Sequence, residues 1–186
     1  MELDLNFVRN EYPSLRDDYI YLDNAGGSQT LKRVIDKITE YYMTSDVQLG
    51  ASYSVSIKAR ERVNKGTAQI ASTVNANLPH EVIVGGSSTA LIRLFSIVIG
   101  RTLNPGDEII ITNCDHEANI SPWKDLKHQG IVIKTWEFDK KSLKLELKDL
   151  DKLMTKKTKL VAFCHTSNIF GTVHPVKKIT EFIHNR

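Results

Sequence analysis

The second half of the chain alternates short apolar runs with longer amphipathic segments. The runs are rich in Ile and Val and are bounded by Gly, Pro, Asn or Asp, which is typical of buried strands. The segments between them carry apolar residues every three or four positions, as helices do. We expect strands at 81–84, 108–112, 130–135 and 158–163, and helices at 90–99, 118–128, 147–154 and from Pro175 onward. This alternation predicts an α/β fold, a mainly parallel sheet flanked by helices.

The first half of the chain is expected to be helical, with two loops. Apolar residues at helical spacing predict one helix over 31–44 and a second over 55–74. A short helix is expected to end near Leu15, followed by an extended segment at 19–22. That segment leads into a turn-rich loop at 23–28, whose paired glycines permit unusual backbone dihedrals.

Composition and charge exclude several classes of protein. A chain of 186 residues with 41% hydrophobic and 25% charged residues can bury one sizeable core, as soluble globular proteins do. The net charge of +3 comes from scattered lysines rather than from one basic face, so no nucleic-acid partner is expected. The N-terminus lacks the apolar core of a signal peptide, and no apolar run approaches membrane-spanning length, so no membrane association is expected.

The two cysteines indicate a reducing compartment. Cys114 and Cys164 lie in or beside predicted core strands, which argues against a secreted disulfide framework. We interpret both as small buried residues rather than nucleophiles, since nothing beside either one obviously lowers its pKa. A cytoplasmic location is therefore expected.

Polar side chains follow two of the predicted strands. His116 stands between two acids after 108–112, and the run from Cys164 to Asn168 follows 158–163. Because ligands bind at the C-terminal edge of open parallel sheets, this repetition suggests one shared cofactor site. His116 is a candidate for stacking on a flat cofactor, for general acid–base chemistry, or for capping the helix expected near Ala118. Asn168 has the alternative of satisfying its own backbone in a turn, and His165 that of a core histidine.

A glycine-rich turn precedes the helix expected at 90–99. Gly85-Gly86-Ser87-Ser88-Thr89 places hydroxyls and unpaired N–H groups at a helix N-terminus, which suits a phosphate. The alternative is an ordinary turn with Ser or Thr as N-cap. The turn matches neither the Walker nor the GxGxxG pattern, and no residues stand at the spacing of a zinc motif, so no metal ligand is assigned.

Four motifs in order resemble one family. They are YLDNAGGSQ, VIVGGSST, PGDEIIITNCDHEANISPW and KLVAFCHTSNIFGTVHPV, and the resemblance that they carry extends over nearly the whole chain, from about Tyr12 to His184. The order and spacing resemble the class V aminotransferase group of pyridoxal-phosphate enzymes, in particular its cysteine desulfurase-like and selenocysteine lyase branch. Only the N-terminal portion of such an enzyme is represented.

The resemblance implies roles for several residues and pyridoxal 5′-phosphate as cofactor of the full-length protein. His116 matches the catalytic histidine whose ring stacks on the pyridine ring. Asn168 matches the asparagine that hydrogen-bonds the phenolic oxygen of the cofactor. Ser87 and Ser88 match the hydroxyl pair that binds the phosphate.

Other positions match the family loops that contact substrate. Ala25 and Gly26 match a loop that closes over the substrate. Gln48-Leu49 stands where many desulfurases carry histidine-arginine, so a different substrate is conceivable.

The family's remaining parts come later in its sequences. The aspartate that pairs with the pyridinium nitrogen, the Schiff-base lysine and the small domain all follow the region matched here. We therefore expect residues 1–30 to form an N-terminal arm and substrate loop, and residues 31–186 to form part of a fold-type-I large domain. The strands at Ile109, Val132 and Val161 are expected to be neighbours, with the strand at 82–84 apart from them.

The function implied is that of an N-terminal portion of a pyridoxal-phosphate-dependent C–S lyase. Its substrate would be cysteine or a related amino acid, and the full-length protein is expected to be a homodimer. Two alternatives remain open. One is a parent aminotransferase or epimerase of the same family, and the other is a truncated, non-catalytic binding or assembly module.

Overall fold

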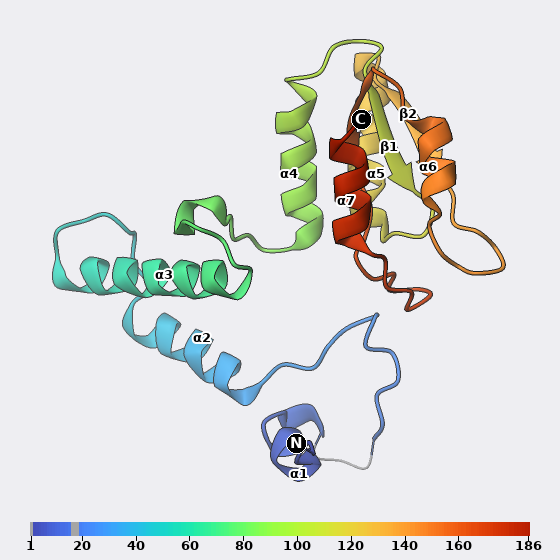
Figure 1. The fold of residues 1–186 in the computed structure, drawn as a ribbon. Coiled ribbons are helices and arrows are strands. Elements are labelled where there is room, and N and C mark those ends of the chain that lie inside the picture. The colour runs from blue at the N-terminus through green and yellow to red at the C-terminus, as the bar shows by residue number, and fades with distance from the viewer. Residues whose placement is uncertain (1, 16–18) are drawn as a thin grey trace. The chain divides into compact units, whose positions relative to one another are not determined.

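The computed structural model describes residues 2–15 and 19–186, which divide into two compact units. The first unit ends at Val84 and the second begins at Gly85 (Figure 1). Within the predicted N-terminal arm, positions 1 and 16–18 lie outside the described residues. In the described part of the chain, no helix is long and apolar enough to cross a membrane.

The first unit is helical, as expected, and has no strand among its described residues. Its two long helices lie within two residues of the predicted bounds, and the predicted helix near Leu15 is a short helix followed by a 3₁₀ turn. The helices are α1 (Leu5–Asn10), α2 (Lys32–Thr44) and α3 (Ser54–Thr73), with 3₁₀ turns at Pro13–Leu15 and Pro79–Glu81.

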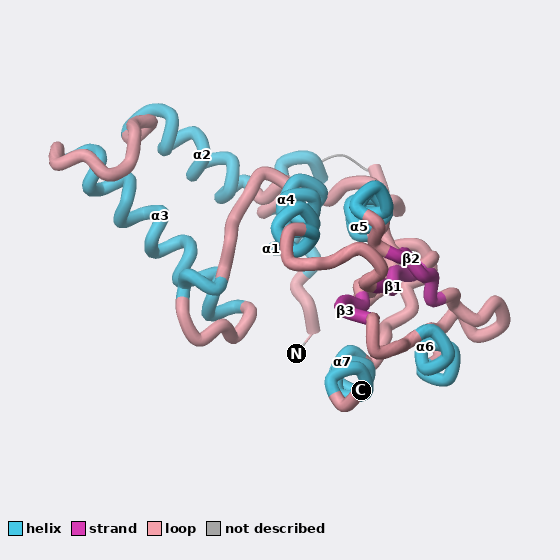
Figure 2. The backbone as a smooth tube through the Cα atoms, turned by 90° about the horizontal axis from the view of Figure 1, so that it is seen from above, coloured by secondary structure: helices cyan, strands magenta, loops and turns pink. Residues whose placement is uncertain are grey.

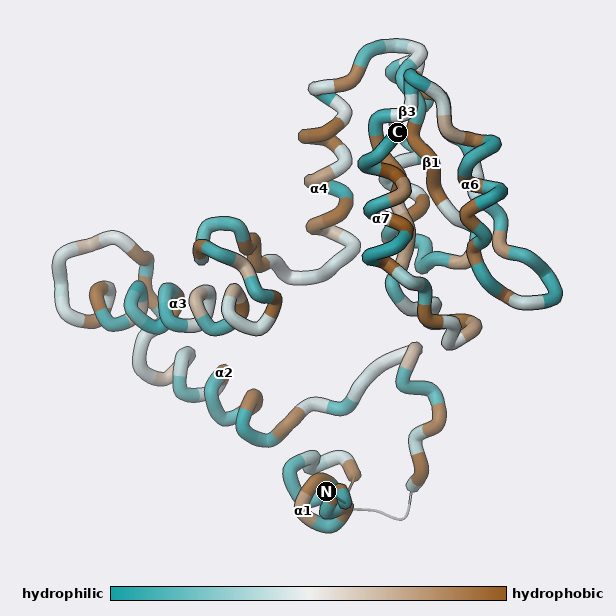
Figure 3. Tube along the Cα trace, in the orientation of Figure 1, coloured by the Kyte–Doolittle hydropathy of each residue, from teal (hydrophilic) through white to brown (hydrophobic). Residues whose placement is uncertain are grey.

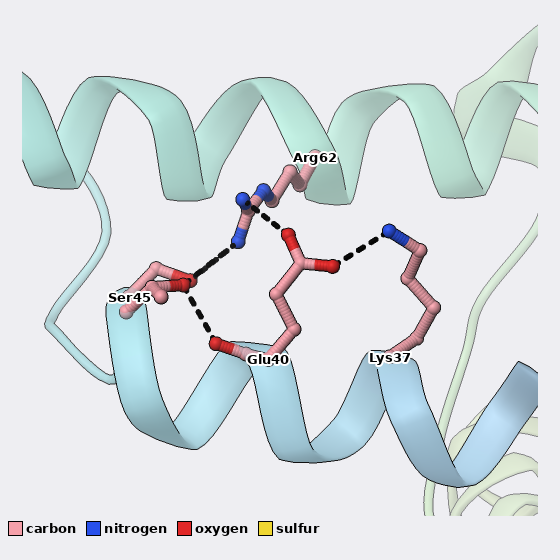
Figure 4. A network of polar contacts seen from close by, with 5 residues as sticks. Lys37, Glu40, Ser45 and Arg62 are labelled. Carbon is pink, nitrogen blue, oxygen red and sulfur yellow. Dashed lines mark hydrogen bonds and ion pairs between the residues drawn. The ribbon is translucent and has the colours of Figure 1, made fainter.

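A polar network joins α2 to α3. The guanidinium of Arg62 on α3 donates to Glu40 Oε1 at 2.8 Å and to Ser45 Oγ at 2.8 Å. Lys37 donates to the other carboxylate oxygen of Glu40 at 2.6 Å (Figure 4). Lys37 and Arg62 together hold the pKa of Glu40 below its ordinary value. Because these groups are exposed, the network contributes little free energy and mainly fixes how the two helices meet.

The second unit contains a three-stranded sheet in which every pairing is parallel. The strands are β1 (Glu108–Thr112), β2 (Val132–Trp136) and β3 (Thr158–Val161), in the order β2-β1-β3. All five residues of β1 are buried, which explains why its three consecutive isoleucines, brown in Figure 3, do not alternate with polar residues. The prediction that these three strands are neighbours is confirmed.

Helices cover both faces of this sheet. Ile109 and Ile111 face α4 (Ser88–Gly100) and α5 (Ser121–Lys124), where Trp123 and Leu126 complete one core cluster. Ile110 faces the other cluster, to which α6 (Leu147–Leu153) and α7 (Val176–His184) contribute. Figure 2 shows the sheet between these two helical layers. The predicted α/β fold with a parallel sheet flanked by helices is thus confirmed.

The strand predicted at 81–84 is wrong. The segment forms the end of a 3₁₀ turn and then an irregular connection, in which Ile83 is 80% exposed and Val84 61% exposed. A strand needs a neighbour to satisfy its backbone N–H and C=O groups, and no strand in the described part of the chain pairs with this segment. Apolar composition alone therefore does not make this segment a strand.

The single helix predicted at 118–128 is also wrong in form. The segment consists of a 3₁₀ turn at Glu117–Asn119, the short helix α5 and a second 3₁₀ turn at Asp125–Gln129. Pro122 lies inside this segment, lacks a backbone N–H and would clash with the preceding turn of a continuous α-helix. The break therefore occurs just before the proline, at Ile120.

A partly buried ion pair lies near the N-terminal end of the sheet. Lys134 Nζ on β2 lies 2.8 Å from Glu108 Oε2 on β1, and it also donates to the Leu153 carbonyl at 2.8 Å. The hydroxyls of Thr155 and Thr158 donate to the same carboxylate oxygen at 2.7 and 3.0 Å. The lysine above all, and then the two hydroxyls, hold the pKa of Glu108 below its usual value although burial opposes this.

This carboxylate predicts a loss of stability in acid. Because the folded-state pKa of Glu108 lies below the ordinary value of 4.5, its contribution is present above that pH and is lost as pH falls through the folded pKa. The difference in unfolding free energy between wild type and Glu108→Gln should be constant above about pH 5 and should shrink below it. Urea titrations between pH 6 and about pH 3 measure this difference. A difference in unfolding free energy that grows as the pH falls would contradict a lowered pKa of Glu108.

Candidate functional site

Three connections meet at one end of the second unit. β1 and β3 are parallel neighbours, so the loops that follow them leave the same edge of the sheet. α4 runs opposite to β1 and begins at that same end (Figure 1), and it packs against the 3₁₀ turn at Glu117–Asn119. This edge is where open parallel sheets bind ligands, and His116, Asn168, Ser87 and Ser88 all belong to it.

The loop after β1 is held by a chain of side-chain hydrogen bonds. The buried carboxylate of Asp115 accepts from the backbone N–H of His116 at 2.7 Å and from the Asn119 amide at 2.7 Å. The Asn119 carbonyl oxygen in turn accepts from Trp123 Nε1 at 3.1 Å. Sequence reasoning missed these positioning residues. Their regular spacing of four, Asp115, Asn119 and Trp123, is a signal that could have found them.

His116 caps the 3₁₀ turn that it precedes. Its Nδ1 accepts the backbone N–H of Ala118 at 3.1 Å, so the neutral ring carries its proton on Nε2. This is the capping role considered as an alternative for His116. Capping is compatible with stacking on a cofactor and with acid–base chemistry, because the residue is exposed and Nε2 has no partner among the described residues. The cap instead fixes the orientation of the ring at the edge of the sheet.

The loop after β3 is a tight hairpin with Asn168 near its tip. Thr166 pairs with Val173, His174 N–H donates to the His165 carbonyl at 2.8 Å, and Gly171 takes a left-handed φ of 67°. Asn168 is exposed, and its side-chain amide makes no hydrogen bond with any described residue. The alternative role, in which the Asn168 side chain hydrogen-bonds to the backbone of its own turn, is therefore not observed.

Ser167, rather than Asn168, satisfies the backbone of this turn with its side chain. It also joins the two loops. The residue is 1% exposed, and its hydroxyl donates to the Cys114 carbonyl at 2.9 Å. The same oxygen accepts from the N–H groups of Ile169 and Phe170 at 3.3 and 3.2 Å. The loops that carry His116 and Asn168 are thereby fixed to each other.

Replacing Ser167 with alanine should therefore destabilise the second unit. The change leaves the Cys114 carbonyl and two N–H groups without this partner, and a buried unsatisfied group costs about 1–3 kcal/mol. Urea unfolding should show a loss of this size. Thr166→Ala, an exposed change one position earlier in the same hairpin, serves as the control and should stay within about 0.5 kcal/mol of wild type. Equal losses in both variants would contradict the role given to Ser167.

The two cysteines near this edge are free thiols held in the protonated form. Burial raises the pKa of Cys114, and burial together with the nearby Asp115 carboxylate raises the pKa of Cys164 to about 12. A thiol that stays protonated near neutral pH is a poor nucleophile. This agrees with the expectation that neither is a nucleophile; Cys114 is buried as expected, whereas Cys164 is only partly buried.

One histidine of this region was misjudged from the sequence. His165, considered as a core histidine, is exposed, and its backbone rather than its ring holds the hairpin. The buried histidine is His174, at 1% exposure, and burial lowers its pKa. Nothing in the local sequence distinguishes the two, since each lies beside β-branched or proline residues.

The start of α4 offers donors to an anion. Ser87 is the N-cap, and its Oγ accepts from Ala90 N–H at 3.2 Å, which leaves the hydroxyl proton free to donate. The N–H groups of Ser88 and Thr89 have no partner among the described residues. Both considered roles for this turn are thus compatible: it is a serine-capped helix start, and its free N–H groups and helix dipole favour negative charge.

Ala25 and Gly26 lie in the first unit. They form an exposed turn in which the Asp23 carboxylate accepts the Gly26 N–H at 3.1 Å. An added Cβ at Gly26 would come within 2.4 Å of that carboxylate, so a larger residue there would displace the Asp23 side chain from this contact. Because each unit is described by itself, the participation of Ala25 and Gly26 in the site stays a prediction.

Comparison with known proteins gives consistent matches. Residues 20–186 match the family model described as "Aminotransferase class-V". The chain is 40% identical to "Aminotransferase-like protein FGM3" of Gibberella zeae over 95% of this chain and 45% of that protein. It is 32% identical to a "Probable cysteine desulfurase" of Synechocystis sp. over 95% of this chain and 44% of that protein.

A solved structure shares the fold. The apo structure of a cysteine desulfurase from Thermococcus onnurineus NA1 superposes with a TM-score of 0.89 and 26% identity, covering 100% of this chain and 46% of that one. The chain spans about half the length of the curated relatives it matches.

Proposed function

The chain belongs to the class V aminotransferase family, and we propose that it is the N-terminal part of a pyridoxal-phosphate-dependent enzyme that cleaves the C–S bond of cysteine or a related amino acid. The observation that carries the proposal is the shared edge at which His116, Asn168 and the start of α4 lie. Relatives named as cysteine desulfurases support the substrate class. The fold, that of fold-type-I enzymes of this cofactor, agrees with it.

The residues at this edge fit the cofactor. Pyridoxal phosphate has an anionic phosphate, a flat aromatic ring and a phenolic oxygen. The start of α4 provides unpaired N–H groups and a hydroxyl for an anion, His116 provides an exposed ring of fixed orientation, and Asn168 provides an unpaired amide donor. The phosphate, the flat ring and the phenolic oxygen thus each have a matching group on this chain.

The proposed roles follow from this match. Ser87 and Ser88 bind the phosphate through hydroxyl and backbone N–H groups at the positive end of the helix dipole. The ring of His116 would pack against the cofactor ring and orient it. Asn168 would donate to the phenolic oxygen, and Ser167 holds the loop of Asn168 to the loop of His116.

The bound cofactor supplies an electron-withdrawing ring that stabilises negative charge beside the substrate's amino nitrogen. The residues of this chain orient that ring and hold its phosphate. We assign to His116 Nε2 the transfer of a proton to or from the substrate, because Nδ1 is taken by the Ala118 N–H. No lysine of this chain is assigned to covalent attachment of the cofactor.

We further propose an amino-acid substrate, a homodimeric complete protein and a cytosolic location. The two free thiols, Cys114 and Cys164, suit a reducing compartment. Ala25 and Gly26 are proposed to close over the substrate, as in the family loop they match. Gln48 and Leu49, in place of the histidine-arginine of many desulfurases, make a relative of cysteine a candidate substrate too.

The test is a product assay with the complete protein and added pyridoxal phosphate. Cysteine, selenocysteine and a panel of other amino acids are supplied one at a time, and sulfide or selenide, keto acid and racemised substrate are each measured. Alanine formation supports the proposal, with the sulfur atom released as sulfide when a thiol reductant such as dithiothreitol is added to supply the two electrons. Keto acid formation with amino transfer, or racemisation without C–S cleavage, would identify an aminotransferase or epimerase instead. An unchanged cofactor absorbance with every amino acid would refute catalysis altogether.

A further inference from the structure

A second cluster of side chains, all of types that bind metal ions, lies at the loops of the candidate site. Cys114 follows β1, Cys164 follows β3 and His174 closes the hairpin, and their Sγ, Sγ and imidazole nitrogen atoms lie within 4.8 Å of one another. Cys114 Sγ is 4.0 Å from His174 Nε2. In the described part of the chain, no other group of three metal-ligating side chains comes this close together. None of the three has a role in the function proposed above.

The Thr112 hydroxyl provides an independent observation at the same place. Thr112 is 1% exposed, and its Oγ1 has no hydrogen-bond partner among the nitrogen and oxygen atoms of the described residues. Its neighbour is the Cys114 thiol, which forms only weak hydrogen bonds. A buried hydroxyl in this position can take a stronger partner, such as a water or an ion.

We propose that Cys114, Cys164 and His174 bind one zinc ion, with the Thr112 hydroxyl, or a water that it holds, at the fourth position. Three atoms no more than 4.8 Å apart leave a point within about 2.8 Å of each, and zinc needs about 2.3 Å to sulfur and about 2.0 Å to nitrogen. Small side-chain rotations therefore suffice. Two thiolates and one imidazole are also a ligand set that zinc prefers.

The charges balance in this buried place. On binding, each thiol releases one proton to solvent and the His174 nitrogen donates its lone pair, with no change of oxidation state. The two thiolates then cancel the charge of Zn²⁺, so a neutral complex replaces two thiols. A neutral complex avoids the large cost of burying a net charge.

The proposed ion has a structural effect on the candidate site. Its ligands come from both loops that Ser167 joins. Cys114 lies two residues before His116, and Cys164 lies four residues before Asn168. A zinc ion there crosslinks the loops and holds these side chains in place. The ligands are 50 and 10 residues apart in the chain, which matches no zinc motif, so the sequence alone gave no sign of the cluster.

The test uses the untagged protein, stripped of metal with a chelator and kept reduced. Addition of Co²⁺ should produce the visible absorbance bands of a tetrahedral thiolate site, saturating at one ion per chain and displaced by Zn²⁺. Zinc should also raise the thermal unfolding midpoint and protect both thiols from alkylation. The chain contains two cysteines, so the thiol count is unambiguous.

Two variants distinguish this site from adventitious binding. Cys164→Ala is a conservative change at a partly buried position and should abolish the cobalt bands, the thermal shift and the protection of Cys114. His165→Gln, an exposed histidine in the same hairpin, should leave all three unchanged. Bands that survive Cys164→Ala, or no stoichiometric band in wild type, would overturn the proposal. Formation of a Cys114–Cys164 disulfide by hydrogen peroxide at the same rate with and without zinc would overturn it as well.

Discussion

Replacing His116 with alanine in the complete enzyme is expected to lower kcat about 100-fold, while the affinity for pyridoxal phosphate falls much less. The ring of His116 is held at the sheet edge by its bond to the Ala118 N–H, and misplacing a reacting group by about 1 Å costs a factor of this size. The phosphate donors at the start of α4 are untouched and keep the cofactor bound. Steady-state kinetics and the cofactor's absorbance spectrum measure the two effects.

Two further substitutions separate the cap from the ring. Asparagine is a good N-cap, so His116→Asn keeps the bond to the Ala118 N–H and removes the ring. His116→Phe keeps a flat ring and removes the cap. If stacking is the role, activity should be higher in the phenylalanine variant than in the asparagine variant, and stability should follow the opposite order. Full activity in His116→Asn would refute a role for the ring in catalysis.

Replacing Trp136 with alanine should cost about 3–5 kcal/mol of stability. The side chain at the end of β2 is 0% exposed and lies edge-on to Phe163. Its Nε1 donates to the Glu146 carbonyl at 3.1 Å, so the change creates a cavity and leaves a carbonyl unpaired. Urea unfolding followed by the fluorescence of Trp123, the remaining tryptophan, measures the loss.

Val132→Ala on the same strand is the matched control. Val132 is 44% exposed, and its truncation should change the unfolding free energy by about 0.5 kcal/mol or less. A Trp136→Ala protein as stable as Val132→Ala would show that the cluster around Ile110 and Leu150 does not behave as the core of this unit.

Hydrophobic runs and proline positions predicted most helices and strands correctly. In these segments, the conformation depends mainly on residues that are close together in the sequence. The central strand at 108–112 was predicted to the residue, since three isoleucines between turn residues have few alternatives to burial in a sheet. Pro175 marked the start of α7 within one residue, because proline suits the beginning of a helix. The break at Pro122 followed from the same chemistry and was overlooked in favour of the surrounding periodicity.

The wrong prediction of a strand at 82–84 has a different cause. Its apolar residues satisfy every local criterion for a strand, yet a strand is defined by hydrogen bonds to another segment. No local pattern reports whether such a partner is present. The same limit applies to Ser167, because its hydrogen bond to the Cys114 carbonyl joins residues 53 positions apart.

The sequence by itself determined the kind of fold, the family and the edge of the sheet at which polar groups gather, because periodicity and motif order are properties of neighbouring residues. Tertiary structure alone decided which side chains meet there. It assigned Ser167 rather than Asn168 to the turn, left the Asn168 amide unpaired, buried His174 in place of His165, and brought two cysteines and a histidine together. Each of these outcomes depends on contacts between segments far apart in the chain, and the free energy of such contacts is set by packing and by hydrogen-bond geometry that no local pattern encodes.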